Sequence, residues 1–98
     1  MNIITAQELK SKIENNEIFQ LIDVREDYEY EDVNIGGINI PLEKVIDSYD
    51  KIDTTKQVVF CCKSGKRSKA IILTLQRKLN LENLFSLEGG IEGYFETK

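Results

Sequence analysis

Apolar residues are concentrated in short runs, which are separated by polar segments with helical spacing. Two of these runs, Phe19–Val24 and Gln57–Cys61, are almost continuously apolar. Such runs are typical of strands that are covered on both faces of a sheet. Shorter apolar runs predict three more strands, at residues 2–4, 38–40 and 84–86.

The polar segments between the strands carry signals for helices. Thr5 and Glu8 have the spacing of a capping box, and Leu9 and Ile13 then share one face, so a helix is expected to start after Thr5. The polar run at residues 14–16 ends it. Shorter helical segments are predicted for YEYEDV with Asp27 as its cap and for IEGYF after Gly89-Gly90, and residues 42–53 are expected to form a small helix and its exit loop.

The longest predicted helix runs from Ser68 to Leu79, and Asn80 suits the position just beyond its end. Strands that alternate with helices predict an α/β fold, with a mainly parallel five-stranded sheet and helices on both faces. The length favours one domain, residues 1–98. In such sheets ligands bind at the carboxyl ends of the strands, where the loop after Cys61 is expected to lie.

Composition and charge exclude several classes of function. The chain is 41% hydrophobic, with a formal net charge of −4 and a pI of about 4.8. No nucleic-acid partner is therefore expected, because such partners require clustered Lys and Arg. No apolar run approaches the roughly 20 residues of a membrane span, and the start MNIITAQELKSK lacks the pattern of an export signal. We expect a cytoplasmic protein without a membrane partner.

The chain contains two cysteines, Cys61 and Cys62, and no histidine. Successive Cα atoms lie about 3.8 Å apart, whereas disulfides usually need about 4.4 to 6.8 Å, so both thiols are expected to be reduced. The absence of histidine excludes Cys-His pairs, Ser-His-Asp triads and histidine-ligated metals. Two cysteines alone make a poor zinc site, so no metal is predicted.

The segment FCCKSGKRS, residues 60–68, is the strongest candidate for a functional site. Successive strand residues point to opposite faces, so Cys61 is expected to pack between the sheet and a helix. Cys62 lies where the strand gives way to polar residues, and its sulfur is expected to face the loop and solvent. Cys62 is therefore predicted to be the reactive thiol.

The residues after Cys62 favour negative charge on its sulfur. A loop that leads into a helix directs free backbone N–H groups and the positive end of the helix dipole towards a nearby anion. Gly65 permits a positive φ and a close approach of the backbone. Lys63, Lys66 and Arg67 add positive charge, which favours a thiolate over a thiol and equally favours a docked anion.

Residues 58–68 resemble the active-site segment of the rhodanese-like sulfurtransferases, Cys-(Arg/Lys)-Ser-Gly-x-Arg-Ser. Three other segments resemble family motifs in the same order, and together they cover essentially the whole chain. They are LIDVRE at 21–26, YEYEDVNIGGINIPL at 28–42 and LEGGIEGY at 87–94. The resemblance implies a doubly wound parallel sheet. The segment 28–42 is also similar to rhodanese modules of enzymes that adenylylate sulfur-carrier proteins.

The resemblance implies sulfur transfer through Cys62. The thiolate would take the outer sulfur of thiosulfate or of a persulfide donor and would keep it as a Cys62 persulfide. A thiol or cyanide would then accept this sulfur, and no cofactor beyond the covalent persulfide is implied. The implied partners are a small anionic sulfur donor and a sulfur-accepting protein, such as thioredoxin or a sulfur-carrier protein.

The resemblance also assigns roles to the residues around Cys62. Asp23 and Arg25 are interpreted as structural support that hydrogen-bonds the loops near the strand ends. For Ser68 we favour a helix-capping role over donation to the ligand. The segment that binds the anion would consist of Lys63, Ser64, Gly65, Lys66, Arg67 and Ser68.

Three positions depart from the family pattern. Val33 and Asn34 stand where the family usually has Gly and His, so any role of that histidine is absent here. Tyr94 replaces the usual Trp and is expected to keep an aromatic wall. None of the three lies in the loop.

Two other functions are compatible with the sequence. Cys61 and Arg67 form a Cys-x5-Arg pattern, which is the signature of cysteine-dependent phosphatases and arsenate reductases. Phe60 stands where phosphatases normally have His, and no Asp is obviously placed as the acid, which both favour sulfur chemistry. A non-catalytic rhodanese-like binding module is the second alternative, although such modules typically lack the cysteine or the cationic loop.

Overall fold

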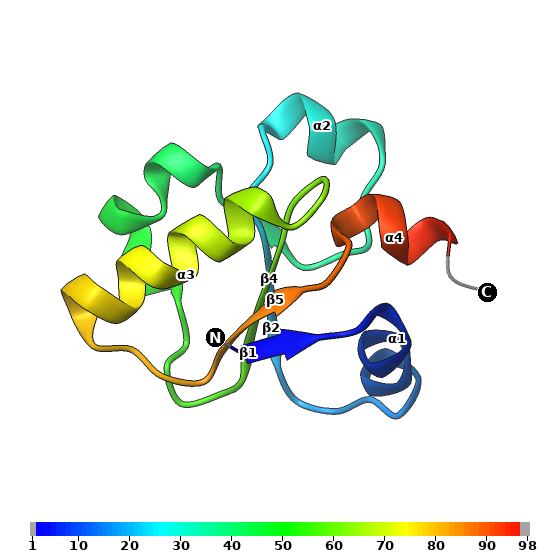
Figure 1. Ribbon diagram of the computed structural model, residues 1–98, viewed down its shortest axis with the longest axis horizontal. Coiled ribbons are helices and arrows are strands. Elements are labelled where there is room, and N and C mark those ends of the chain that lie inside the picture. Colours follow the sequence, from blue (N-terminus) through cyan, green and yellow to red (C-terminus); the bar gives the residue numbers. More distant parts are fainter. Residues whose placement is uncertain (1, 97–98) are drawn as a thin grey trace.

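The computed structural model describes residues 2–96, which form a five-stranded sheet with helices on both faces (Figure 1). All strand pairs are parallel, in the order β1-β5-β4-β2-β3. The strands are β1 (Asn2–Ile4), β2 (Gln20–Asp23), β3 (Ile38–Asn39), β4 (Val58–Cys61) and β5 (Leu84–Leu87). The helices are α1 (Ala6–Glu14), α2 (Asp27–Asp32), α3 (Lys66–Leu79) and α4 (Gly90–Glu96), with the 3₁₀ helices η1 (Leu42–Lys44) and η2 (Ile46–Lys51).

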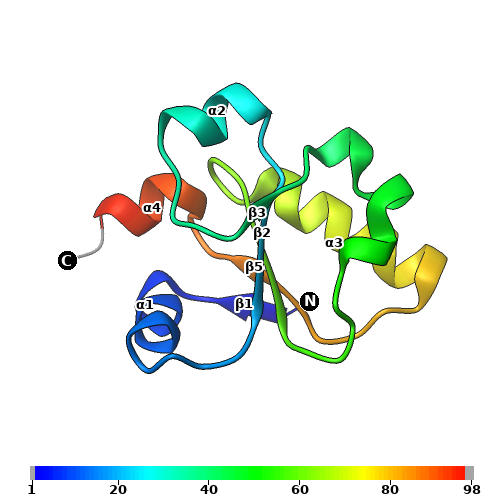
Figure 2. The same cartoon turned by 180° about the vertical axis from the view of Figure 1, so that it is seen from behind.

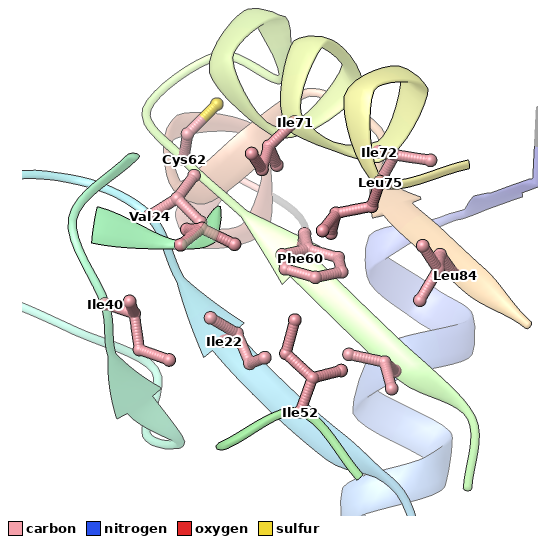
Figure 3. Packing of buried hydrophobic residues seen from close by; sticks show 12 residues of the cluster. Ile22, Val24, Ile40, Ile52, Phe60, Cys62, Ile71, Ile72, Leu75 and Leu84 are labelled. Carbon is pink, nitrogen blue, oxygen red and sulfur yellow. The ribbon is translucent and has the colours of Figure 1, made fainter. Parts of the chain in front are cut away.

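The helices form two layers that sandwich the sheet. Figures 1 and 2 show α3 and the two 3₁₀ helices on one face, α1 and α4 on the other, and α2 above the carboxyl edge. Side chains of β4 alternate between the layers: Phe60 packs with Ile72 and Leu75 of α3 (Figure 3), and Val59 packs with Leu9 of α1. Because β4 is buried on both faces, it has the continuous apolar pattern that predicted a parallel strand.

The predicted α/β class is confirmed, and all five predicted strands are present with ends within one residue of the prediction. The capping box is also present: the Glu8 backbone N–H donates to Thr5 Oγ1 at 3.1 Å, and Glu8 Oε1 accepts from the Thr5 N–H at 3.0 Å. Asn80 ends α3 in the left-handed conformation. No helix among residues 2–96 is long and apolar enough to span a membrane.

Three local predictions were wrong. The cap of α2 is Glu26 and not Asp27, because Glu26 is the last residue with an extended backbone. Residues 42–53 form two 3₁₀ helices, η1 and η2, and not one small helix with an exit loop; the non-helical backbone of Ser48 adds a kink inside η2. The helix α3 starts at Lys66 and not at Ser68, because Gly65 takes the N-cap position with φ +107°.

Candidate active site

The loop between β4 and α3 lies at the carboxyl edge of the sheet. Figures 1 and 2 both place it between α2 and α4. β2 and β4 are paired with Asp23 opposite Cys61, so both strands end beside this loop. The parallel topology thus brings the end of β2 and the start of α3 to one site, as the sequence predicted.

The sulfur of Cys62 lies inside the curve of this loop. It accepts a hydrogen bond from the Gly65 backbone N–H at 3.1 Å and one from the Ser68 N–H at 3.4 Å. Figure 3 shows the sulfur turned away from the sheet towards the first turn of α3. The first N–H groups of a helix have no partner within the helix, so the start of α3 supplies donors that stabilise negative charge on this sulfur.

The sequence prediction that the sulfur of Cys62 faces solvent was wrong. The side chain is only 1% exposed and borders the apolar cluster under α3. The loop and the first turn of α3 curl over the sulfur, which accepts from the Gly65 N–H at 3.1 Å and the Ser68 N–H at 3.4 Å; α3 begins two residues earlier than predicted, which brings Ser68 into this turn. The thiol therefore faces the loop but is covered by it.

Cys61 points to the opposite face of the sheet. It is fully buried with Leu9, Leu87 and Ile91. Burial raises the pKa of the Cys61 thiol well above its usual value, and the negative charge of Asp23 raises it further. A thiol that is buried and protonated is a poor nucleophile. The structure therefore disfavours the Cys-x5-Arg pattern that begins at Cys61.

Gly65 and Ser68 shape the floor of the loop, and both are buried. Gly65 caps α3 with φ +107°, a conformation that residues with a Cβ rarely adopt. Ser68 is in the first turn of α3 and is not its cap, contrary to the prediction. Its hydroxyl donates to the Gly65 carbonyl at 3.0 Å and lies 2.7 Å from Ser86 Oγ. Ser86, a polar residue in the apolar strand LFSL, is a support that the sequence analysis missed.

The three predicted cations of the loop have different surroundings. Lys63 and Lys66 are exposed, as is Ser64. Arg67 instead points to α2, where its guanidinium donates to both carboxylate oxygens of Glu29 at 2.8 and 3.1 Å. This contact lowers the pKa of Glu29 to about 2, mainly through the hydrogen bonds from Arg67. Glu29 therefore neutralises part of the positive charge of Arg67, which the sequence analysis had assigned to anion binding. In the sequence, only the acidic character of residues 27–32 pointed to such a partner.

Asp23 and Arg25 form a buried ion pair below the loop. The guanidinium donates to both oxygens of the Asp23 carboxylate, with a shortest distance of 2.8 Å, and also to the Val33 carbonyl at 2.7 Å. The Asn39 amide donates to the carbonyls of both Asp23 and Arg25. These contacts connect the end of β2 to the segment after α2 and to β3, so the ion pair has a structural role.

The positions that depart from the family pattern serve local structure. Asn34 closes a turn: its amide donates to the Tyr30 carbonyl at 2.9 Å, and its Oδ1 accepts from the Gly36 N–H at 2.9 Å. Tyr94 packs on the cluster around Cys61, with the Lys10 ammonium 4.7 Å from its ring centre. The aromatic residue that faces the loop side of α4 is instead Phe95, which lines a pocket next to Lys63.

The close contact between α4 and the loop requires a glycine. Gly90 has φ +62°, and a Cβ there would lie 2.6 Å from the Cys62 carbonyl oxygen and still closer to that of Lys63. We expect Gly90→Ala to lower the free energy of unfolding by about 2–4 kcal/mol, because backbone strain adds to the clash. Gly93→Ala in the same helix is the control, since its nearest atom is 3.7 Å away. Equal urea-unfolding midpoints for the two variants would contradict this account.

The ion pair between Glu29 and Arg67 should make stability depend on pH. The pKa of Glu29 falls from 4.5 to about 2 on folding, so its contribution is present above about pH 4.5 and disappears towards pH 2. We expect Glu29→Gln to be about 1–2 kcal/mol less stable at pH 7, after allowance for partial exposure. The difference should shrink during acidification below pH 4.5, as followed by urea unfolding. The exposed Glu31→Gln on the same helix should show no such trend; a constant difference for Glu29→Gln down to pH 2.5 would exclude the ion pair as its source.

No group of three metal-ligating side chains is positioned to hold a metal within residues 2–96. The site defined so far is a cysteine at the end of a parallel strand, held by the backbone of a glycine-containing loop at a helix start. In a parallel α/β domain, a cysteine in these surroundings suits chemistry that starts from a thiolate.

The comparisons with known proteins are more specific. The family model of the Rhodanese-like domain matches residues 5–97, so the chain belongs to this family. A rhodanese-related protein from Thermoplasma volcanium has a similar structure, with a TM-score of 0.84, 29% identity and coverage of 98% of this chain and 92% of that one. A rhodanese-like domain protein from Staphylococcus aureus has a TM-score of 0.86 at 27% identity, over 96% and 91% of the two chains.

Relatives by sequence include proteins whose names refer to the transfer or carriage of sulfur. YtwF of Bacillus subtilis, provisionally named a sulfurtransferase, is 39% identical over 66% of this chain and 64% of its own. YrkF of the same organism, provisionally named a sulfur carrier protein, is 30% identical over 76% of this chain but only 41% of its own. The chain thus spans less than two thirds of these relatives. A Rhodopseudomonas palustris protein described as a possible tyrosine phosphatase is 19% identical, and this likeness shows a shared fold alone.

Proposed function

We propose that this protein is a sulfurtransferase that carries a sulfane sulfur as a persulfide on Cys62. The observation that supports this most directly is the position of the Cys62 sulfur, 3.1 Å from the Gly65 N–H and 3.4 Å from the Ser68 N–H at the start of α3. These donors favour an anionic sulfur. The name of the relative YtwF supports the same class of reaction.

Two displacements at sulfur would complete the cycle. In the first, the Cys62 thiolate attacks the outer sulfur of thiosulfate; the new S–S bond forms as the bond to the sulfite sulfur breaks, and sulfite leaves with its electron pair. In the second, cyanide or an acceptor thiol attacks the outer sulfur of the persulfide. The Cys62 thiolate is then the leaving group, so it is regenerated and the charges balance. Neither step needs a general base if the thiolate is already formed.

The implied partners follow from this chemistry. A small anionic donor such as thiosulfate would be attracted by the exposed Lys63 and Lys66. The acceptor in the cell would be a protein thiol or a sulfur-carrier protein, and the Cys62 persulfide is the only carrier group required. Two reduced cysteines suit a reducing compartment such as the cytoplasm.

The burial of Cys62 adds a requirement to the proposal. Its side chain is 1% exposed, so a donor cannot reach the sulfur unless the loop moves. The side chains of Lys63, Ser64 and Lys66 are exposed and make no side-chain hydrogen bond within residues 2–96. Ser64 also lies between Lys63, whose carbonyl is bonded to the Glu92 N–H, and the start of α3 at Lys66, so the turn around Ser64 can move at the least cost. We propose that displacement of these loop residues admits the donor.

Intact-protein mass spectrometry tests the proposed function. The reduced protein is incubated with thiosulfate, freed of small molecules and weighed. We expect a gain of one sulfur atom per chain, and we expect cyanide to remove it with release of one thiocyanate. Absence of the adduct would overturn the proposal in favour of a binding module. Turnover of p-nitrophenyl phosphate without an adduct would instead favour a phosphatase.

A further inference from the structure

A pocket of about 580 Å³ lies beside the Cys62 loop and is lined by residues of α2 and α4. Figure 1 shows these two helices on either side of the loop. The walls of the pocket include Tyr28 of α2 and Phe95 of α4, and Lys63 of the loop borders it. The first turn of α4 is bonded to the loop, because the Ile91 and Glu92 N–H groups donate to the carbonyls of Cys62 and Lys63 at 2.8 and 3.1 Å. The pocket therefore shares a border with the backbone that carries the reactive thiol.

The rim of the pocket exposes large apolar side chains. Tyr28 is 70% exposed, Phe95 53% and Val33 45%. Neighbouring exposed apolar residues around a hollow are typical of a surface that a partner covers. A small inorganic donor has no apolar group that could pack against these side chains, so they indicate a larger binding partner.

The unpaired charges around the pocket differ in sign between its walls and its border with the loop. Arg25 and Glu29 line it but are paired with Asp23 and Arg67 respectively. Asp32 on α2 and Glu92 on α4 are exposed and form no ion pair within the described part of the chain, residues 2–96. Lys63, at the loop end, is likewise unpaired there. The walls are thus acidic and the end towards Cys62 is basic.

We propose that this pocket is the docking site for the sulfur-accepting protein, and that it receives a segment with a large apolar side chain flanked by Lys or Arg. This inference rests on the proposed function. The apolar side chain would pack against Phe95 and Val33, and the cations would face Asp32 and Glu92. An acceptor thiol a few residues further along the segment would then lie beside Lys63, which attracts its thiolate, and the proposed displacement of the loop would let it reach the Cys62 persulfide.

The transfer step is a simple exchange at sulfur. The acceptor thiolate attacks the outer sulfur of the Cys62 persulfide, an S–S bond forms on the acceptor, and the S–S bond to Cys62 breaks. The electron pair returns to the Cys62 sulfur as thiolate, so no oxidant or reductant is consumed. The pocket contributes only by holding the acceptor near the persulfide, which raises the effective concentration of its thiol.

Peptides that end in an acceptor thiol test the proposal. The first is acetyl-Lys-Phe-Lys-Gly-Ser-Gly-Cys-amide; in the second Glu replaces each Lys, and in the third Ala replaces Phe. The protein is loaded with thiosulfate, its persulfide content is checked by mass, and loss of the persulfide is followed in single turnovers. We expect the first peptide to react about tenfold faster, at subsaturating concentration, than either of the others. The advantage over the Glu peptide should fall in 1 M NaCl. Equal rates for the three peptides would overturn the proposal.

Variants of the pocket test whether the peptide preference arises there. In the charge reversal Asp32→Lys/Glu92→Lys, the preference for the Lys peptide over the Glu peptide should invert, whereas the exposed Asp47→Lys on η2 should keep the wild-type ratio. In Phe95→Ala, the Phe and Ala peptides should react at similar rates. Rate ratios are independent of how much protein was loaded. An unchanged ratio in the charge reversal would contradict docking at this pocket.

A binding measurement separates this inference from the proposed function. Fluorescence polarisation with labelled peptides in which Ser replaces Cys needs no persulfide. Tighter binding of the Lys-Phe-Lys peptide, lost in the charge reversal, would support the docking site even if thiosulfate left no adduct on Cys62. An adduct on Cys62 with no selective peptide binding would leave sulfur transfer intact and would overturn the docking site.

Discussion

Replacing Cys62 with alanine is expected to abolish sulfur transfer. The thiosulfate adduct should disappear, and turnover of thiosulfate with cyanide should fall by roughly 10³-fold or more, which is typical for removal of a nucleophile. The reason is that no other sulfur can take its place: Met1 has no thiol, and Cys61 is buried on the other face of the sheet. Intact mass and thiocyanate release measure both effects.

Cys61→Ala is the matched control for this variant. It removes the neighbouring thiol from a fully buried position, so it should lower the free energy of unfolding by about 1 kcal/mol through a small cavity. The adduct should still form, because the loop and its N–H donors are untouched. If the adduct disappeared in Cys61→Ala and persisted in Cys62→Ala, the assignment of the nucleophile would be reversed and the Cys-x5-Arg pattern would regain support.

The largest loss of stability is expected for Asp23→Ala. Asp23 and Arg25 are 0% and 4% exposed, and the Arg25 guanidinium donates to the Asp23 carboxylate at distances down to 2.8 Å. Removal of the carboxylate leaves a buried guanidinium without its counter-charge, which should lower the free energy of unfolding by about 3–5 kcal/mol. The milder variant Asp23→Asn keeps the shape of the side chain, and its stability is measured instead if Asp23→Ala does not fold. Urea unfolding at pH 7 gives the difference.

Two comparisons test whether the loss of stability in Asp23→Ala comes from the uncompensated charge of Arg25. The ion pair between Asp53 and Lys56 is exposed, so Lys56→Ala should shift the urea midpoint far less than Asp23→Ala. The double variant Asp23→Leu/Arg25→Met removes both charges and should recover much of the lost stability. If the double variant were as unstable as Asp23→Ala, the loss would come from the hydrogen bonds to neighbouring loops and not from the uncompensated charge.

Several features of the site could be predicted because they depend on neighbours in the sequence. The alternation of β4 decided which face each cysteine occupies, and Gly65 marked the point where the chain turns into α3. The loop position also followed, because the carboxyl ends of parallel strands meet at one edge. These inferences need only the period of a strand and the conformational freedom of glycine.

Other features depend on residues far apart in the chain. Arg67 binds Glu29, which lies 38 residues earlier, and Ser68 meets Ser86, 18 residues later. Such contacts are decided by how α2, α3 and β5 pack, so no local pattern in the sequence identifies the partners. For the same reason the sequence did not reveal that Arg67 is partly neutralised or that Ser86 supports the loop.

The sequence by itself determined the parallel α/β class, the approximate ends of the strands and the chain position of the loop after β4, because periodicity and backbone preferences act over a few residues. Only the tertiary structure decided that Cys62 is covered, that Arg67 is held by α2, and that α2 and α4 enclose a pocket beside the loop. These depend on the docking of whole helices against the sheet, in which Gly90 allows α4 to approach the Cys62 backbone. Burial and pairing of charge are consequences of that packing, and they set the chemistry of the site.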